Sequence, residues 1–538
     1  MKLQIQSDCR DMPDVVDVMK RIFEDRNIED PWHFLNPTED DMLPFEDLKN
    51  IDEASQIILC AVEYDERIGV VADVDCDGIT SCSIIYRYLK KLKPELDIKT
   101  YINHGKSHGL QRNDLEKYKD RNLLIIVDSL DPTAFNYEEV QIDSDITDVV
   151  VLDHHTINPK IPYDKWITLV SSQQGYGNPE LSGAGVCMKF ILYLDKILGL
   201  DYAEEFYDLA ATGTLADVMD VTVPENRYII SRGLEEIHNP AIQKLAGGFD
   251  WNSKSVLFSI APAVNSSMRL DKNEYSLRAF LADDNKEVLD NVRELKKCKE
   301  KQNQEIDSIM KDLIEQCNNQ LDKRMIVVFI TSENGIAGLI GSRLLEKYKR
   351  PIIVLKEVDD CFVGSMRAIG VDDFQAMINE SGLAESFGHP LAAGVNIKKK
   401  NFKAFCDYME KNLPNVGEFE ETISADIWVR PENIDRGFID EIQKINKISG
   451  TGFQPIKVYM NEITDYEIDD MSNGKHLVIH LGNSDLTLIK WNFDGDWNEL
   501  QDASMFGLEL ECTAELQMGF IGRTFLLQGI INWLHVKE

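Results

Sequence analysis

Short apolar runs alternate with stretches of helical periodicity between about residues 67 and 170 of the chain. The runs read RIGVVADV, IKTYIN, LLIIVDS, DVVVLDH and WITLV. LLIIV and VVVL are apolar throughout, as strands covered on both faces of a sheet are. Strands separated by helices predict a parallel sheet with crossover helices. Ligands of open α/β sheets bind at the carboxyl ends of the strands, so the residues that follow these runs are candidates for chemistry.

The pattern changes twice further along the chain. A charged stretch from about Lys286 to Leu321 has apolar residues spaced by three and four, which predicts one long amphipathic helix connecting two domains. After it, the runs MIVVFIT, PIIVLK and CFVGSM, with a helix from Gly338 to Lys349, start a second α/β pattern. From about Glu420, short strands such as HLVIHL and LTLIKW favour a small β-barrel, for which an OB-fold is the first choice.

The predicted fold class is therefore α/β: two α/β domains joined by a long helix, with a C-terminal β-barrel. A chain of 538 residues is long enough for several cores. The predicted boundaries are an N-terminal helical segment at 1–50, a first α/β domain with a parallel sheet at 51–285, the connecting helix at 286–322, a second α/β domain at 323–415 and the barrel at 416–538.

Bulk composition is that of an ordinary globular protein, with 43% hydrophobic and 28% charged residues. The start of the chain has no apolar segment behind a basic one, and the longest apolar runs are strand-sized. We expect a cytosolic protein with no membrane partner. The ten cysteines include no CxxC pair, so neither a disulfide framework nor a zinc knuckle is indicated.

The formal net charge of −36 argues against a nucleic-acid partner, because phosphate binding rests on clustered lysine and arginine. A local basic groove can still exist on an acidic protein. A carboxylate-rich metal site also contributes negative charge that a bound cation offsets. Net charge alone therefore leaves the partner open.

Three aspartates follow the first apolar run of the predicted sheet: Asp73, Asp75 and Asp77. A turning loop at the end of a strand brings such carboxylates together, and a hard divalent cation offsets their repulsion. An aspartate-rich turn is the alternative explanation for this motif alone. However, Asp128 ends the next apolar run, Asp153-His154-His155 ends the one after, and Asp217 lies in TGTLADVMDV. Mixed aspartate and histidine ligands favour manganese over calcium.

These motifs resemble those of the DHH phosphoesterase superfamily, and similarity to the RecJ-type nucleases within it extends over nearly the whole chain. The resemblance implies that Asp128 bridges two divalent ions, Mn²⁺ preferred or Mg²⁺. It implies metal ligation by Asp75, Asp77, Asp128, His154 and Asp217, and supporting or phosphate-binding roles for Asp73 and His155; Asp153 belongs to the same motif as the two histidines. Together these eight residues are the predicted catalytic set.

The second α/β domain resembles the DHH-associated domain, which grips the substrate in such proteins. By this resemblance and by residue type, the candidate substrate-binding residues are Lys106, Asn265, Arg269, Ser365, Arg367 and His389. Arginine suits phosphate because its guanidinium binds it bidentately, although ordinary surface or helix-cap roles are the alternative for Arg269, Ser365 and Arg367. The run Gly335–Gly341 has the spacing GxxGxxG rather than that of a dinucleotide fingerprint, so we interpret it as a helix N-terminus able to bind phosphate.

The resemblance implies a 5′-to-3′ exonuclease that hydrolyses single-stranded DNA, in DNA repair, recombination or replication. A single-stranded-DNA-binding protein and a helicase are the candidate protein partners, and we expect a monomer. Two alternatives stay open: a DHH enzyme acting on short oligonucleotides or small phosphates, and a non-catalytic Cdc45-like replication factor. The basic run Ile397–Lys403 is either a DNA contact or a solvated face.

Three departures from the family pattern lie on the substrate side. Where many RecJ sequences have a Trp-His pair, this chain has Ser332-Glu333-Asn334, and the usual Gly-Gly-His is Phe387-Gly388-His389. Lys106 stands where an arginine is common. The metal-ligand motifs are intact, so the departures bear on polarity and substrate length more than on hydrolysis.

Overall fold

The computed structural model describes residues 2–12, 14–105, 115–129, 144–157, 167–247, 250–332, 335–415, 422–493, 495–521 and 524–537. The chain divides into two compact units. The first contains residues 1–101, 109–261 and 422–538, and the second contains residues 102–108 and 262–421.

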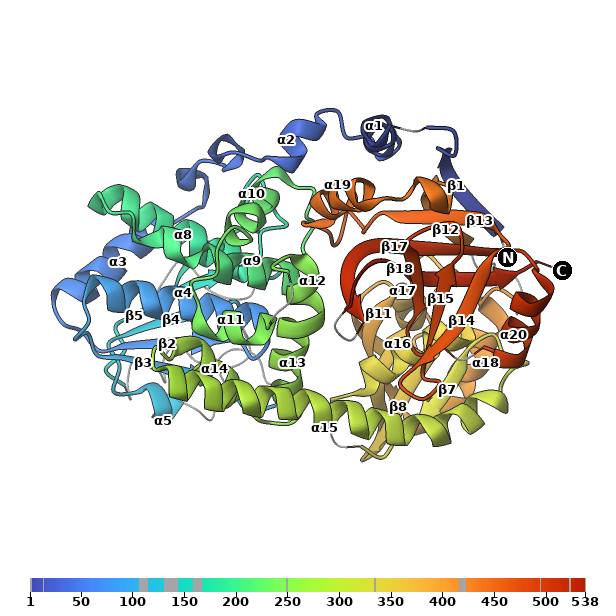
Figure 1. Ribbon diagram of the computed structural model, residues 1–538. Helices are drawn as coiled ribbons and strands as arrows, with labels where there is room; N and C mark the ends of the chain where they lie inside the picture. The colour runs from blue at the N-terminus through green and yellow to red at the C-terminus, as the bar shows by residue number, and fades with distance from the viewer. Residues whose placement is uncertain are drawn as a thin grey trace. The chain divides into compact units, whose positions relative to one another are not determined.

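The first unit contains the predicted parallel sheet, with strand order β3-β2-β4-β5-β6 (Figure 1). Its strands are β2 (Ile68–Ala72), β3 (Ile98–Ile102), β4 (Leu123–Val127), β5 (Asp148–Asp153) and β6 (Ile167–Ser171). All five apolar runs named from the sequence are strands, and β2, β4, β5 and β6 pair in parallel. β2 and β4 are buried along their whole length, which explains why neither shows polar alternation.

Helices cover this sheet and connect its strands. α4 (Cys76–Leu92) packs on β2, α8 (Gly183–Leu198) packs on β5, and α9 (Tyr207–Ala216) packs on both helices. The other helices of this unit are α1 (Val15–Asp25), α2 (Pro31–Leu35), α3 (Ile51–Glu63), α5 (Leu115–Tyr118), α10 (Pro224–Gly233), α11 (Pro240–Ala246) and α12 (Ser253–Ser255).

The C-terminal strands form a strongly curved sheet that is consistent with the predicted OB-like domain (Figure 1). Its strands are β12 (Thr422–Trp428), β13 (Lys457–Ile463), β14 (Tyr466–Met471), β15 (His476–Leu481), β16 (Leu486–Lys490), β17 (Leu510–Ile521) and β18 (Thr524–Val536). The helices α19 (Arg436–Asn446) and α20 (Trp497–Phe506) accompany them.

An eighth strand joins this sheet from the other end of the chain. β1 (Lys2–Asp8) pairs in parallel with β12, in a register that places Lys2 beside Thr422. The prediction of a purely helical segment at 1–50 is therefore wrong for its first residues. The alternation in KLQIQSD rests on Leu3 and Ile5 alone, and its partner strand is remote in sequence, so the run carries little strand signal.

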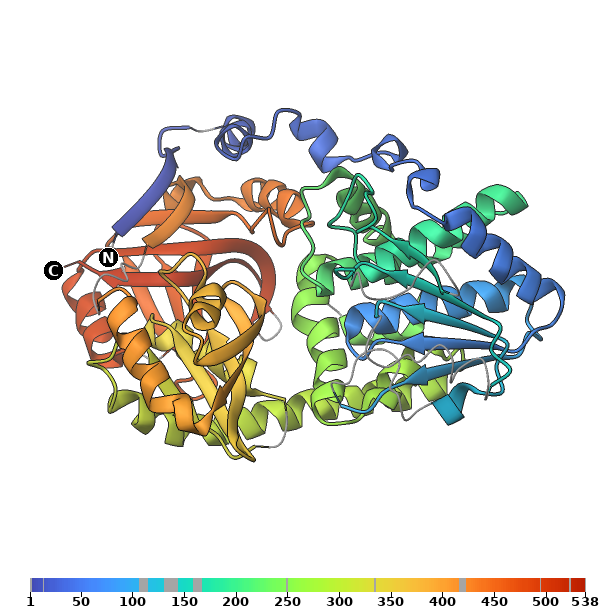
Figure 2. The ribbon, with the colours of Figure 1, turned by 180° about the vertical axis from the view of Figure 1, so that it is seen from behind.

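The second unit contains a mixed sheet with strand order β10-β11-β9-β8-β7, seen from behind in Figure 2. Its strands are β7 (Ile326–Phe329), β8 (Ile352–Val358), β9 (Cys361–Arg367), β10 (Ala384–His389) and β11 (Ala392–Lys398). Its helices are α13 (Ala261–Arg269), α14 (Asn273–Leu281), α15 (Asn285–Asn318), α16 (Ala337–Tyr348), α17 (Phe374–Glu380) and α18 (Phe402–Asn412). α15 is the predicted long helix; it packs on α14, and it packs on β7 through a core that includes Ile306 and Leu313.

Candidate metal centre

Each strand end that the sequence singled out delivers a polar side chain to the same edge of the parallel sheet. Asp73 follows β2, and Asp75 is the N-cap of α4, where its Oδ1 accepts a hydrogen bond from the Gly78 amide at 3.1 Å. Asp77 lies in the first turn of that helix, where the helix dipole favours a carboxylate. Asp128 follows β4.

The structure brings the predicted carboxylates and imidazoles within ligand distance of one another. Three groups have candidate ligand atoms that all lie within 4.8 Å of each other: Asp128, His154 and His155; Asp77, His154 and Asp217; and Asp73, Asp75 and Asp128. The groups contain all five predicted metal ligands. They also contain Asp73 and His155, for which the sequence suggested only supporting roles.

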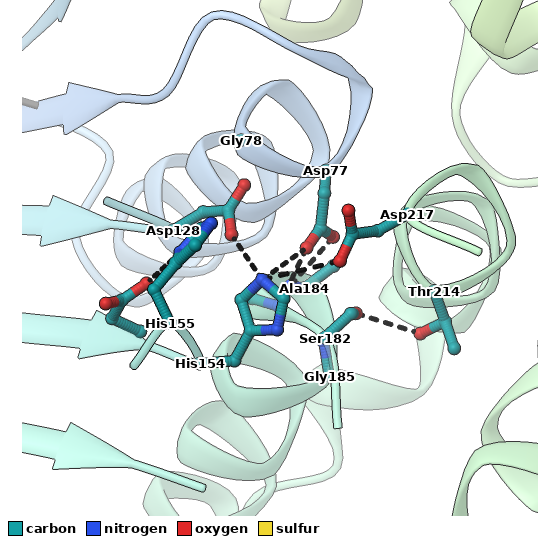
Figure 3. A network of polar contacts seen from close by, with 12 residues as sticks. Asp77, Gly78, Asp128, His154, His155, Ser182, Ala184, Gly185, Thr214 and Asp217 are labelled. Atoms are coloured by element: carbon teal, nitrogen blue, oxygen red, sulfur yellow. Dashed lines mark hydrogen bonds and ion pairs between the residues drawn. The ribbon is translucent and has the colours of Figure 1, made fainter. Parts of the chain in front are cut away.

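His154 lies at the centre of the cluster (Figure 3). Its Nε2 is 3.2 Å from Asp128 Oδ1, 3.4 Å from Asp217 Oδ2 and 3.9 Å from Asp77 Oδ2. The side chains of Asp77 and Asp128 are 1% and 2% exposed, whereas that of Asp217 is 29% exposed. One imidazole thus faces three carboxylates, two of which are buried.

Burial and mutual repulsion disfavour the ionised form of these carboxyl groups. Burial, followed by the charges of Asp77 and Asp75, raises the pKa of Asp128 well above its usual range. The same causes raise the pKa of Asp217 to about 8. Burial lowers the pKa of His154, so the imidazole is a poor counter-ion for its neighbours. A cation bound here would reverse these shifts by favouring the ionised carboxylates.

Asp128 provides a direct test of whether the residues fit a metal ion. Its Oδ1 is buried and has no hydrogen-bond partner, because the 3.2 Å approach of His154 lacks hydrogen-bond geometry. A buried carboxylate oxygen without a hydrogen-bond donor destabilises the fold unless a cation binds it. Oxygen and imidazole donors in this number suit Mn²⁺ or Mg²⁺. The donor set therefore fits a divalent cation.

The N-terminus of α8 orients Asp77. The amides of Gly183 and Ala184 donate to its two carboxylate oxygens at 2.7 and 3.0 Å. Ser182 caps the helix by accepting from the Gly185 amide at 3.1 Å, and its hydroxyl lies 3.1 Å from that of Thr214 (Figure 3). The carboxylate is held in place before any ligand binds.

Glycines pack directly against three of the aspartates. A Cβ added to Gly183 would lie 2.4 Å from Asp128 Oδ1, and one added to Gly213 would lie 2.3 Å from Asp77 Oδ1. A Cβ on Gly78 would lie 2.5 Å from the Cβ of Asp73. The roles of these glycines could not be predicted from the metal-ligand motifs. The runs of small residues in LSGAG and TGTLAD were the available signal.

The backbone is left-handed at one candidate ligand and directly after another. Asp128 has φ +58°, and Val218, directly after Asp217, has φ +62°. Val218 donates to Leu215 O and Met219 donates to Thr214 O, which is the Schellman ending of a helix with valine where glycine is favoured. Left-handed backbone at a β-branched residue is strained, and such strain concentrates at functional sites.

His155 pairs with Asp153 rather than joining the three-carboxylate contact. Its Nδ1 lies 2.9 Å from Asp153 Oδ1. This hydrogen bond, with the charges of Asp153 and Asp73, raises the pKa of His155 to about 9. The pairing with Asp153 therefore favours the protonated imidazole, whose ring is partly exposed.

Candidate phosphate-binding residues gather in the second unit. Burial, then the neighbouring charge of Arg367, lowers the pKa of Arg269, whose Nη1 donates to Gln302 at 3.3 Å. Arg367 donates to the Ser342 hydroxyl at 3.1 Å, and its guanidinium lies 2.7 Å from where a Cβ on Gly338 would be. Arg367 thus lies beside the N-terminus of α16, and Arg269 lies close enough for the two charges to interact, so this region is electropositive and suits an anion.

The remaining predicted substrate-binding residues lie on several elements, and one lies outside the described residues. Ser365 and His389 lie on strands of the sheet that carries Arg367. Asn265 lies on α13 one turn before Arg269. Lys106 and Glu333 lie outside the described residues. No helix in the described ranges is long and apolar enough to cross a membrane.

This sheet, with carboxylates and histidines at its strand ends, lies in the part of the chain that resembles DHH-type proteins. The model of the DHH family, N-terminal domain, matches residues 67–214. Over most of its length the chain is similar to RecJ-type proteins of the DHH superfamily, as three comparisons with known proteins indicate.

The chain is 27% identical over 512 residues to the putative SPbeta prophage-derived single-strand DNA-specific exonuclease YorK of Bacillus subtilis, covering 88% of this chain and 86% of that protein. It is 26% identical over 498 residues to the single-stranded-DNA-specific exonuclease RecJ of Bacillus subtilis, covering 88% of this chain and 62% of that protein. The crystal structure of RecJ with Mn²⁺ from Thermus thermophilus superposes with a TM-score of 0.79 at 22% identity, covering 100% of this chain and 80% of that one.

Proposed function

We propose that this chain is a metal-dependent exonuclease that hydrolyses the phosphodiester bonds of single-stranded DNA from the 5′ end. The observation that carries the proposal is the cluster around His154, in which Asp128 keeps a buried oxygen without a donor. The names of the similar proteins supply the substrate class, and resemblance to RecJ supplies the direction.

The proposed metal ligands are Asp75, Asp77, Asp128, His154 and Asp217. Divalent cations held there would activate water and stabilise the charge that develops on the oxygens of the reacting phosphorus. Asp77 keeps a fixed orientation because two amides of α8 bind its oxygens. His155 holds a proton, so its free nitrogen can donate to a phosphoryl oxygen while Asp153 holds the other.

We further propose that Arg269, Ser365 and Arg367 bind the terminal phosphate of the strand. The two guanidinium groups repel each other, and a doubly charged anion would relieve that repulsion. Roles for Lys106, Asn265 and His389 in substrate binding, a single-stranded-DNA-binding protein or helicase as partner, and the monomeric state stay predictions, as do the domain boundaries.

Labelled oligonucleotides would test this function. The protein with Mn²⁺ should shorten a linear single strand stepwise from its 5′ end, and it should leave a duplex and a closed single-stranded circle intact. Stepwise shortening from the 3′ end, or rapid cutting of the circle, would contradict the proposal. Activity confined to dinucleotides and small phosphates would favour the alternative DHH phosphodiesterase.

A further inference from the structure

The two faces of the sheet in the second unit differ in what covers them. Alternate residues on each strand point to opposite faces. One face carries Met366, Ala393 and Val395 and is buried in a core with α17 and α18. On the other face, α16 covers Ile352 and Val354 of β8.

The same face continues across β9, where α16 also packs against Arg367, onto the outer strands β11 and β10. The register aligns Phe387 with Gly394, Gly394 with Ser365, and Ser365 with Val354. One step along the face, His389 aligns with Ala392, and Ala392 with Arg367. Directly paired residues point to the same face of a sheet. We call this continuation the open face; it consists of Phe387, His389, Ala392, Gly394, Ser365 and Arg367.

Phe387 is the large apolar side chain of the open face, and it is 71% exposed. Among the described residues it makes no ring-to-ring or cation contact. A single exposed phenylalanine is common on proteins and needs no explanation by itself. The exposure of Phe387 is relevant here because of the residue that lies directly beside it on the sheet.

The fold does not require a glycine at position 394, directly across from Phe387. It lies in the middle of β11, and its φ is not in the left-handed range. A Cβ added to it would meet nothing nearer than Phe387 O at 3.6 Å, an ordinary contact distance. Glycine inside a strand weakens the strand and marks places where a ligand or another backbone approaches closely. Its missing side chain leaves a flat slot between Phe387 and Ser365.

We infer that Phe387 and Gly394 form a stacking slot for one nucleobase, next to the phosphate-binding group of Ser365 and Arg367. This inference rests on the proposed function. Neighbouring strands lie about 4.8 Å apart, so Phe387 and Ser365, two strands apart, are separated by about 10 Å at their Cα atoms. That spacing allows a base on the phenyl ring while the phosphate of the same strand reaches the arginine. Stacking on a phenyl ring tolerates any base.

An abasic scan would test the slot. The substrates are 5′-phosphorylated single strands with one tetrahydrofuran abasic residue at each of the first few positions. For the unaltered protein we expect one position at which losing the base lowers kcat/KM by about 5- to 150-fold, the range that base stacking supplies. Phe387→Ala should lose a similar factor on the intact strand, mainly through KM, and should then be insensitive to the abasic residue at that position.

Three further variants separate stacking from a structural role. Phe387→Trp should restore both the rate and the abasic penalty, whereas Gly394→Val should fold normally and behave like Phe387→Ala. Tyr64→Ala removes an equally exposed aromatic ring, also 71% exposed, and should keep the full penalty. The inference fails if Phe387→Ala keeps the penalty at every position, or if Gly394→Val has no effect. An unaltered protein that does not degrade single strands would instead overturn the proposed function.

Discussion

At the scale of single residues, the candidate site is built from groups that destabilise one another without a cation. Asp128 shows this most clearly, because its carboxyl group is buried, is repelled by four other aspartates and keeps an oxygen without a donor. A side chain of this kind is maintained for binding rather than for stability. Its loss should therefore separate function from folding.

Asp128→Ala should abolish most of the activity and stabilise the metal-free protein. Loss of a residue that supports a metal ligand typically costs about 10- to 100-fold, so loss of a ligand should cost at least about 100-fold. The metal-free variant should gain about 1–3 kcal/mol in its free energy of unfolding, the cost of an unsatisfied buried polar group. Urea denaturation in EDTA and hydrolysis assays with Mn²⁺ would measure the two effects. Asp148→Ala, at the amino end of β5, is the control, and normal turnover by a folded Asp128→Ala variant would refute the site.

The sequence was sufficient to predict the candidate metal ligands that follow strands. It was insufficient to predict the residues that hold those ligands in place. Asp128 and His154 could be predicted because apolar runs ending in polar residues place them at one edge of a parallel sheet. Gly183 could not, since its role depends on contact with a carboxylate on another strand. Phe387 was recognised as a departure from the family pattern, but its exposure and its partner across the sheet required the structure.

At the scale of elements, the N-terminus of α8 connects two parts of the site. Its first amides bind Asp77, and its first glycine lies against Asp128. The element can approach this closely because Gly183 has no side chain. Sequence periodicity predicts that a helix exists, whereas such an approach depends on how two elements pack.

Gly183→Ala should weaken metal binding without weakening the fold. Alanine is favourable in a helix, but its methyl group would displace the Asp128 carboxylate by occupying its place. We expect the Mn²⁺ concentration for half-maximal activity to rise about 10- to 100-fold, as for other residues that orient a ligand. Gly185→Ala, on the same helix, contacts Leu181 rather than a carboxylate and should leave the Mn²⁺ requirement unchanged. Equal Mn²⁺ curves for both variants would show that Gly183 does not position Asp128.

At the scale of the whole molecule, the first unit unites stretches that are remote in sequence. Val221 donates to Thr451 O at 3.0 Å, and the Ser449 amide donates to the Ser253 hydroxyl at 3.0 Å. The predicted barrel thus shares hydrogen bonds with the domain that carries the metal centre. A domain boundary at residue 416 could be placed from the change in strand pattern, but that change does not reveal contacts with the preceding domain.

Removal of residues 422–538 should therefore damage the rest of the first unit. β1 would lose the strand it pairs with, and buried polar groups near Ser253 would lose their partners. We expect a lower melting temperature and faster proteolysis of the metal-centre domain. Thermal unfolding of the truncated and full-length chains would measure this, with and without Mn²⁺. An unchanged melting temperature would show that the C-terminal strands are an independent domain.

The net charge of −36 predicts a weak dependence of DNA affinity on salt, because such a protein has few basic residues to contact the phosphates of a DNA strand. Each phosphate contact with a single strand contributes about −0.7 to the slope of log affinity against log salt. If the phosphate contacts are mainly those of Arg269 and Arg367, the slope should be about −1.4.

Fluorescence anisotropy of the Asp128→Ala protein with a 5′-phosphorylated oligonucleotide, in Mn²⁺ and about 50 to about 200 mM KCl, would measure this slope. Arg269→Gln should make the slope shallower by about 0.7, whereas Lys403→Gln, in the basic run, should not change it. A slope steeper than about −4 would mean that a broad basic surface holds the strand, and the two arginines would then be a minor part of the binding site.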